Sequence, residues 1–122
     1  MPPAKLAGLR ILLLEDEYLI AMDVELLCRD HGAAEVIIKR SVDELEGPLG
    51  AFDVAIVDLM LGSHSTVPFA ERLRDAGRAF VFASGYAGND DLQNAFPGVQ
   101  VVGKPYSGTD LIEAVAAAAG RN

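Results

Sequence analysis

Carboxylates and one lysine follow apolar runs of the sequence, at positions where a folded chain could bring them together. Glu15 and Asp16 follow the first run, Asp58 ends the third, and Lys104 follows the fifth. Three carboxylates about 5 Å apart repel by roughly 3 kcal/mol per pair at an effective dielectric constant near 20, so such a cluster keeps a proton or recruits a cation. Oxygen ligands with no neighbouring His or Cys suit Mg²⁺. The residue types therefore predict a magnesium site beside a cationic side chain.

Length, composition and charge limit the class of protein. The 122 residues suffice for one domain with a single core, and Cys28, the one cysteine, has no partner in the chain for a disulfide. A formal net charge of −8 disfavours nucleic acid and anionic membranes as direct partners. The first residues lack the apolar stretch of a signal peptide, and no apolar run has the length of a membrane span. We therefore expect a cytoplasmic protein without membrane insertion, with Cys28 in its core.

Five short apolar runs alternate with helix-like stretches, which is typical of a parallel sheet covered on both faces. Strands are predicted at residues 10–14, 35–38, 53–57, 79–83 and 99–102. Helices are predicted from the spacing of Ile20, Val24, Leu27 and Cys28 up to a stop at His31-Gly32, from a Ser41 capping box to near residues 47–48, from Pro68 to Gly77, over 89–97, and from Ser107 to Gly120. The helix at 89–97 should be weak and mobile, because poor helix formers dominate it. We assign residues 1–8 to an N-terminal tail and 9–120 to one domain, with no further domain.

The order of these elements predicts an α/β fold with a doubly wound, five-stranded parallel sheet in the order 2-1-3-4-5 and the three layers of a flavodoxin-like domain. In this order the C-terminal ends of strands 1, 3, 4 and 5 meet at one edge, where open sheets bind ligands. The polar residues at that edge are Glu15, Asp16, Asp58, Ser84 and Lys104. Taken singly, each has an ordinary role in a turn, a loop or a helix start. Their joint placement favours a functional site.

These residues, in this order and at this spacing, resemble the receiver domain of two-component response regulators over roughly residues 9–119. The resemblance implies that Asp58 accepts a phosphoryl group from a phosphohistidine. It also implies that Ser84 hydrogen-bonds the new group and that Lys104 pairs with it. The proline that follows the lysine in this family matches Pro105, where we expect a cis peptide bond.

The same resemblance implies the ligands of a magnesium ion. Glu15 and Asp16 match the acidic pair of the family, and Asp58 with the backbone carbonyl of Met60 completes the site. We expect the cation to bridge the nucleophile and the phosphoryl group while Lys104 offsets charge on another oxygen. Catalysis of this kind consists mostly of positioning and electrostatics.

A closer resemblance concerns the run from Ala79 to Tyr86. Together with Leu61-Gly62, Pro68 and Ala70, it is similar to the receiver subgroup with a Phe-Ala-Thr-Gly-Tyr signature, although Ser84 replaces the threonine. Members of this subgroup often stand alone and pair with histidine kinases of the HWE type. The resemblance therefore implies a histidine kinase of that type, or a histidine phosphotransfer protein, as the partner.

The switch that follows phosphorylation should differ from the common receiver pattern. Val101 stands where the family usually has an aromatic switch residue, so no ring can swing inward there. Tyr86 is the nearest replacement. We expect Ser84, Gly85 and Tyr86, with the weak helix that follows, to carry the signal by ordering on phosphorylation.

The predicted function is that of a phosphoacceptor response regulator, and not of an enzyme that turns over a separate metabolite. Such a protein would contact a downstream protein partner, shuttle phosphate or drain a kinase, and a homodimer stays open. A flavodoxin-like cofactor binder is disfavoured because Glu15, Asp16 and Glu17 would repel a phosphate. A phosphatase of the haloacid-dehalogenase type is disfavoured because Met60 occupies the place of its second aspartate. A receiver-shaped interaction module that is never phosphorylated stays open as the alternative.

Overall fold

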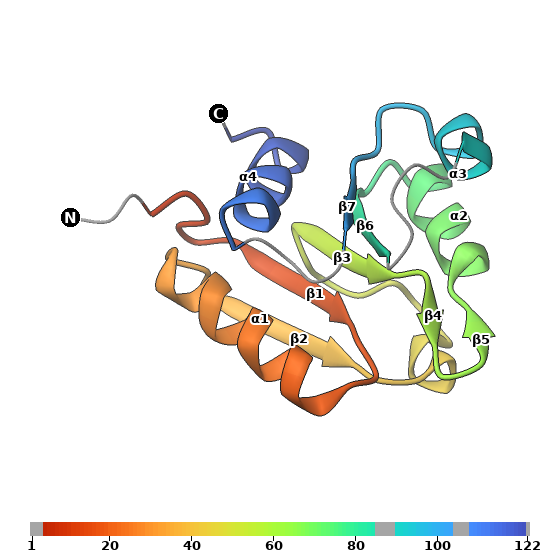
Figure 1. Cartoon of the computed structure of the whole chain (residues 1–122), viewed down its shortest axis with the longest axis horizontal. Helices are drawn as coiled ribbons and strands as arrows, with labels where there is room; N and C mark the ends of the chain where they lie inside the picture. Colours follow the sequence, from red (N-terminus) through yellow and green to blue (C-terminus); the bar gives the residue numbers. More distant parts are fainter. Residues whose placement is uncertain (1–3, 85–89, 104–107, 122) are drawn as a thin grey trace.

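A five-stranded parallel sheet forms the centre of the computed structural model, which describes residues 4–84, 90–103 and 108–121 without the side chains of Asp90 and Asp91. The strand order is β2-β1-β3-β6-β7, which confirms the predicted order and the flavodoxin-like fold (Figure 1). The strands are β1 (Arg10–Leu14), β2 (Glu35–Lys39), β3 (Val54–Asp58), β6 (Ala79–Ser84) and β7 (Val101–Gly103).

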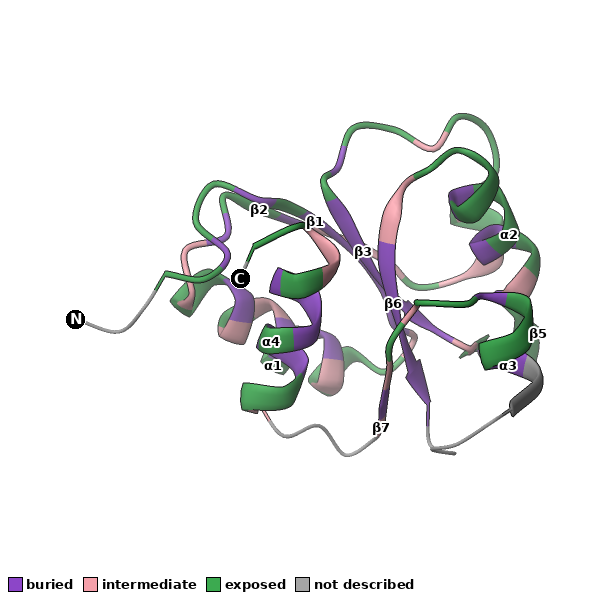
Figure 2. Cartoon of the chain, turned by 90° about the horizontal axis from the view of Figure 1, so that it is seen from above, coloured by how far each residue is buried: buried purple, intermediate pink, exposed green. Residues whose placement is uncertain are grey.

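Helices cover both faces of the sheet. Figure 2 shows α1 and α4 on one face and α2 and α3 on the other. The helices are α1 (Tyr18–Asp30), α2 (Val67–Asp75), α3 (Asp90–Ala95) and α4 (Gly108–Ala118). Across the described ranges, none of them combines the length and the apolar character that a membrane span requires.

The second predicted helix is not an α-helix in the structure. It is a four-residue 3-10 helix, η1 (Val42–Leu45), and the predicted capping box between Ser41 and Glu44 is present. η1 buries no side chain, and a short helix without a packed apolar face has little to stabilise it beyond its cap. Arg72 instead holds the end of η1 and the segment after it, since its guanidinium donates to the carbonyls of Leu45 and Gly47.

Two apolar cores lie on the two faces of the sheet, because successive side chains of a strand point to opposite faces. Ile11 and Leu13 of β1 belong to the core under α1 and α4, whereas Leu12 and Leu14 belong to the core under α2 and α3. Cys28 is fully buried in the first core, as predicted, and burial raises the pKa of its thiol to about 12. The thiol therefore stays protonated at neutral pH.

Part of the segment predicted as a tail contacts the domain. Leu6 is fully buried, and its N–H donates to the carbonyl of His31 at 2.9 Å. Gly32 has a φ of +93°, and a Cβ at this position would lie 3.0 Å from the Cα of Ala7. Gly32 therefore allows both the left-handed end of α1 and the close approach of the N-terminal segment.

β3 is followed by a two-stranded hairpin, which was not predicted from the sequence. β4 (Met60–Leu61) pairs antiparallel with β5 (His64–Ser65), and Leu61 is buried. Strands of two residues are too short to show a period of two in the sequence. Gly62 begins the turn with a φ of +62°, a conformation that glycine adopts without strain.

The Phe96 ring should contribute strongly to stability. It contacts the rings of Phe80 and Phe82 edge to face, with centroid distances of 5.9 Å and 5.1 Å. We expect Phe96→Ala to lower the free energy of unfolding in urea by about 3–5 kcal/mol, because the change removes buried surface and leaves a cavity. The control Leu19→Ala, at a side chain that is 75% exposed, should cost less than about 0.5 kcal/mol. Similar small losses in both variants would contradict this core.

The contribution of Asp53 to stability should depend on pH. Its carboxylate accepts a hydrogen bond from the Arg10 N–H at 2.7 Å, and this bond lowers the pKa of Asp53. Because the folded-state pKa lies below the unfolded value of about 3.9, the carboxylate stabilises the fold above about pH 4, and this stabilisation is lost as the pH falls through the folded-state pKa. Wild type should therefore exceed Asp53→Asn in urea stability near neutral pH, and the difference should shrink on acidification. A difference that grows with acid would overturn this assignment.

Candidate functional site

The three predicted carboxylates meet at the C-terminal edge of the sheet. Glu15, Asp16 and Asp58 each offer one carboxylate oxygen, and these oxygens lie within 4.8 Å of one another. Strand pairing causes this meeting, because Leu14 of β1 is in register with Val57 of β3, and Glu15 and Asp58 are the next residues on the two strands. The predicted joint placement of the acidic residues is confirmed.

Burial makes the cluster unusual among acidic groups. Glu15 is 1% exposed and Asp58 is 8% exposed, whereas most carboxylates of globular proteins face water. The Glu15 carboxylate accepts a hydrogen bond from the Glu17 N–H at 3.1 Å, and the Glu15 N–H donates to the carbonyl of Lys39 at 3.1 Å. The main chain of Glu17 and of Lys39 therefore holds Glu15 at the edge of the sheet.

Backbone amides of the β4–β5 hairpin contact the other two carboxylates. The Met60 N–H donates to Oδ1 of Asp58 at 3.3 Å, and the Gly62 N–H donates to Oδ2 of Asp16 at 2.8 Å. These bonds stabilise the ionised carboxylates and join the loop after β1 to the hairpin. The hairpin, which the sequence analysis missed, is thus part of the site.

Thr66 is a second site residue that the sequence analysis missed. It is 1% exposed, and its Oγ1 donates a hydrogen bond to the carbonyl of Asp58. Its N–H donates to the carbonyl of Leu59 at 3.0 Å. Only the hairpin returns Thr66 to Asp58, eight positions earlier in the chain, so no sequence signal could have identified it.

Ser84 lies at the end of β6, beside β3. Asp58 pairs in register with Ala83, the residue before Ser84, and Ser84 is buried with 3% exposure. On its other side Ser84 pairs with Gly103, the last residue of β7. The predicted residues Gly85, Tyr86, Lys104 and Pro105 lie outside the described residues. Their roles, and the cis peptide bond expected at Pro105, stay predictions.

The remaining two predicted residues occupy different surroundings. Val101 pairs with Phe82 and is partly buried against the core under α2 and α3, and its role at the switch position stays a prediction. The Met60 side chain is 45% exposed, directly beside the acidic cluster. Its backbone carbonyl stays a predicted ligand.

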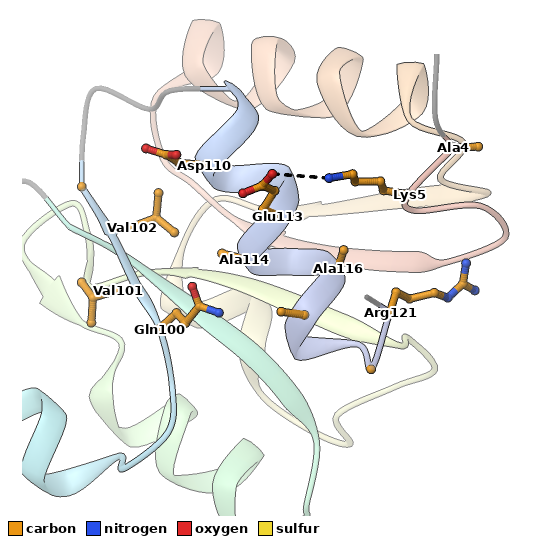
Figure 3. A pocket seen from close by; sticks show the side chains of 13 residues that line it. Ala4, Lys5, Gln100, Val101, Val102, Asp110, Glu113, Ala114, Ala116 and Arg121 are labelled. Atoms are coloured by element: carbon orange, nitrogen blue, oxygen red, sulfur yellow. Dashed lines mark hydrogen bonds and ion pairs between the residues drawn. The ribbon is translucent and has the colours of Figure 1, made fainter. Parts of the chain in front are cut away.

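A cavity lined by described residues lies apart from the acidic cluster. A groove of about 1060 Å³ runs between β7, α4 and the N-terminal segment, and none of the three clustered carboxylates lines it. Figure 3 shows small side chains of α4 along this groove and the ion pair of Lys5 with Glu113, at 3.4 Å, across it. This groove is therefore separate from the candidate site, which is defined by its three carboxylates.

The donor set fits a hard divalent cation. All three ligand atoms are carboxylate oxygens, two of them from buried residues, and such oxygens are the ligands that Mg²⁺ and Ca²⁺ prefer. At 4.8 Å two carboxylates repel by about 3 kcal/mol at an effective dielectric constant of 20, and a cation removes this cost. Mg²⁺ needs one or two carboxylates and keeps water on its other positions, so it fits the cluster.

Magnesium binding should be visible at the Gly62 amide. Because Oδ2 of Asp16 accepts the Gly62 N–H, a cation at this carboxylate must alter that hydrogen bond. We expect Mg²⁺ to shift the Gly62 amide resonance in an NMR titration, and Asp16→Asn to weaken binding at least about tenfold, because one charged ligand is lost. The control Asp75→Asn, on exposed α2, should bind like wild type. Equal affinities for both variants would exclude Asp16 as a ligand.

Solved receiver domains share this fold. The receiver domain of the Francisella response regulator 1452 is 18% identical, with a TM-score of 0.77 over 93% of this chain and 98% of that one. A receiver protein from Burkholderia phymatum is 19% identical, with a TM-score of 0.80 over 94% and 98%. The non-phosphorylated HemR receiver domain from Leptospira biflexa is 20% identical, with a TM-score of 0.79 over 94% and 97%.

Two comparisons based on sequence alone found no match. A scan against protein-family models gave no match, and a search of the curated proteins gave none either. The likeness to the solved structures is therefore a likeness of fold at low sequence identity. The chain has the fold of response regulator receiver domains, with an acidic cluster at the C-terminal edge of its sheet.

Proposed function

We propose that this chain is a response regulator receiver that accepts a phosphoryl group on Asp58. The observation that carries the proposal is the convergence of Glu15, Asp16 and Asp58 within 4.8 Å, at the strand ends of a receiver fold. β3, in which every residue is buried, ends at Asp58 and brings its carboxylate to the C-terminal edge of the sheet with 8% exposure. A receiver-shaped module that is never phosphorylated is the alternative.

The phosphoryl transfer needs a nucleophile in line with the leaving group. A carboxylate oxygen of Asp58 attacks the phosphorus of a phosphohistidine, so that an O–P bond forms while the N–P bond breaks. The electron pair of the broken bond stays on the imidazole nitrogen, which takes up a proton. Glu15, Asp16 and Asp58 would hold Mg²⁺, which would supply charge neutralisation during the transfer. Hydrogen bonds from Met60 N–H and Thr66 Oγ1 hold the Asp58 side chain and backbone in place.

The proposed donor is a histidine kinase, of the HWE type if the subgroup resemblance holds, or a histidine phosphotransfer protein. In this proposal Lys104 offsets charge on the phosphoryl group and Ser84 donates its hydroxyl to it. The place of Ser84 supports this role, because it is buried at the end of β6, one position beyond the residue paired with Asp58.

The proposed output is a change in the segment after Ser84. A phosphoryl group adds up to about two negative charges beside the end of β6, which attracts hydroxyl and amide donors. The nearby helix α3 spans six residues and is anchored to the core by Leu92 and Phe96. So short a helix has little stability of its own, and it can respond to a change at the end of β6. The resulting surface would bind a downstream protein partner, or the chain would shuttle phosphate.

The experiment is phosphorylation of the purified chain with acetyl phosphate or phosphoramidate. Wild type with Mg²⁺ should gain the mass of one phosphoryl group, and EDTA should abolish the gain, because the carboxylates then repel the anionic donor. Asp58→Asn should gain nothing, since an amide cannot form the acyl phosphate. Asp53→Asn is the matched control, because Asp53 immediately precedes the same strand and lies at its opposite end. If wild type is not modified and beryllofluoride causes no conformational change in it, the result would support the unphosphorylated module instead.

A further inference from the structure

We propose that Arg40 is a donor-binding residue, whose guanidinium contacts an anionic oxygen of the phosphodonor as it approaches Asp58. The inference rests on the proposed phosphorylation of Asp58 and concerns how the same site receives its substrate. Arg40 follows β2, at the C-terminal edge of the sheet where the acidic cluster lies. Leu14, the last residue of β1, is in register with Lys39, the last residue of β2, so Glu15 and Arg40 follow adjacent strand ends.

The backbone of Arg40 is fixed by the capping box of η1. One carboxylate oxygen of Glu44 accepts the N–H groups of Arg40 at 2.7 Å and of Ser41 at 3.0 Å. The hydrogen bond from the Arg40 N–H lowers the pKa of Glu44, so this carboxylate is ionised at neutral pH. The cap uses only the main chain of Arg40, which leaves its side chain available for another role.

The side chain of Arg40 leans over the turn that carries the acidic pair. Its Nη2 lies 3.5 Å from the backbone carbonyl oxygen of Asp16, and its Cζ lies 5.6 Å from the centroid of the Tyr18 ring. An arginine stacked over an aromatic ring keeps the edge of its guanidinium free for an anion. The contact with Tyr18 thus places a positive charge at the rim of the site without consuming it.

No carboxylate pairs with Arg40 among the residues that the structure describes. Arg10, Arg29 and Arg74 each lie within 4.0 Å of an acidic side chain, at 3.6, 3.1 and 3.1 Å. Arg78 instead donates to the backbone carbonyls of Gly50 and Phe52, and so supports the segment before β3. Among the described residues, the side chain of Arg40 has one long contact with a backbone carbonyl and one ring contact, so a ligand can take its hydrogen bonds at low cost.

The position of Arg40 matters because of the negative charge of the acidic cluster. Glu15, Asp16 and Asp58 together repel an anionic donor, and one bound Mg²⁺ still leaves a net negative charge on the cluster. A guanidinium beside Asp16 offsets that charge and attracts phosphoryl oxygens, which it can bind with two parallel N–H groups. Charges at the rim of a site chiefly raise the rate of encounter with a charged ligand, and salt screens this effect.

The test measures the second-order rate constant for phosphorylation by acetyl phosphate at saturating Mg²⁺. At low ionic strength Arg40→Gln should be slower than wild type by about three- to tenfold, and the ratio should approach one in about 0.5 M salt. Arg40→Lys should retain most of the rate, because it keeps the charge. The control Arg29→Gln, on the exposed end of α1, should match wild type at every salt concentration.

Two further readouts separate a ligand contact from a structural role. The urea midpoint of Arg40→Gln should equal that of wild type, because the cap does not use the side chain. Its Mg²⁺ affinity should rise, since a positive charge has left the neighbourhood of the cation. If wild type is phosphorylated and Arg40→Gln reacts at the same rate in low salt, the role of Arg40 is excluded and the proposed function stands. If wild type is not phosphorylated at all, both proposals fall.

Discussion

Hydrogen bonding between β1 and β3 is the constraint on which the site depends, because it holds mutually repelling carboxylates together. The register that pairs Leu14 with Val57 makes Glu15 and Asp58 neighbours, and the turn after Glu15 adds Asp16. Both strands lie in the middle of the sheet with nearly every side chain buried, so the repulsion is too small to separate them. The apolar cores on the two faces therefore supply the stability that a charge cluster consumes.

Main-chain groups carry much of the local organisation at this edge. Amides of Glu17, Met60 and Gly62 each donate to one carboxylate, so the oxygens are oriented before any cation binds. Pre-orientation of this kind lowers the reorganisation needed at the moment of reaction. The hairpin after β3 contributes two of these amides, and Thr66 anchors the end of the hairpin to the Asp58 carbonyl.

At the C-terminal edge of the sheet, acidic and basic side chains lie at the ends of different strands. β1 and β3 bring acidic side chains to the centre of this edge, while β2 ends at Lys39 and is followed by Arg40 at the flank. A cation in the centre and a guanidinium at the flank would make one surface that tolerates an anion, although the chain as a whole carries a net charge of −8. Local charge placement, and not net charge, thus decides what can approach Asp58.

The sequence by itself determined the sheet order, the approximate strands and the acidic residues at its edge, because apolar runs ending in a polar residue are read locally and the topology rules are general. Only the tertiary structure decided which groups orient those residues. Thr66, the hairpin amides, the packing of Leu6 and the position of the Arg40 guanidinium each depend on contacts between distant or very short segments, which leave no periodic pattern. The second predicted helix is only the short η1 in the structure. Its cap is present but it buries no side chain, and burial, not the cap alone, decides how far a helix extends.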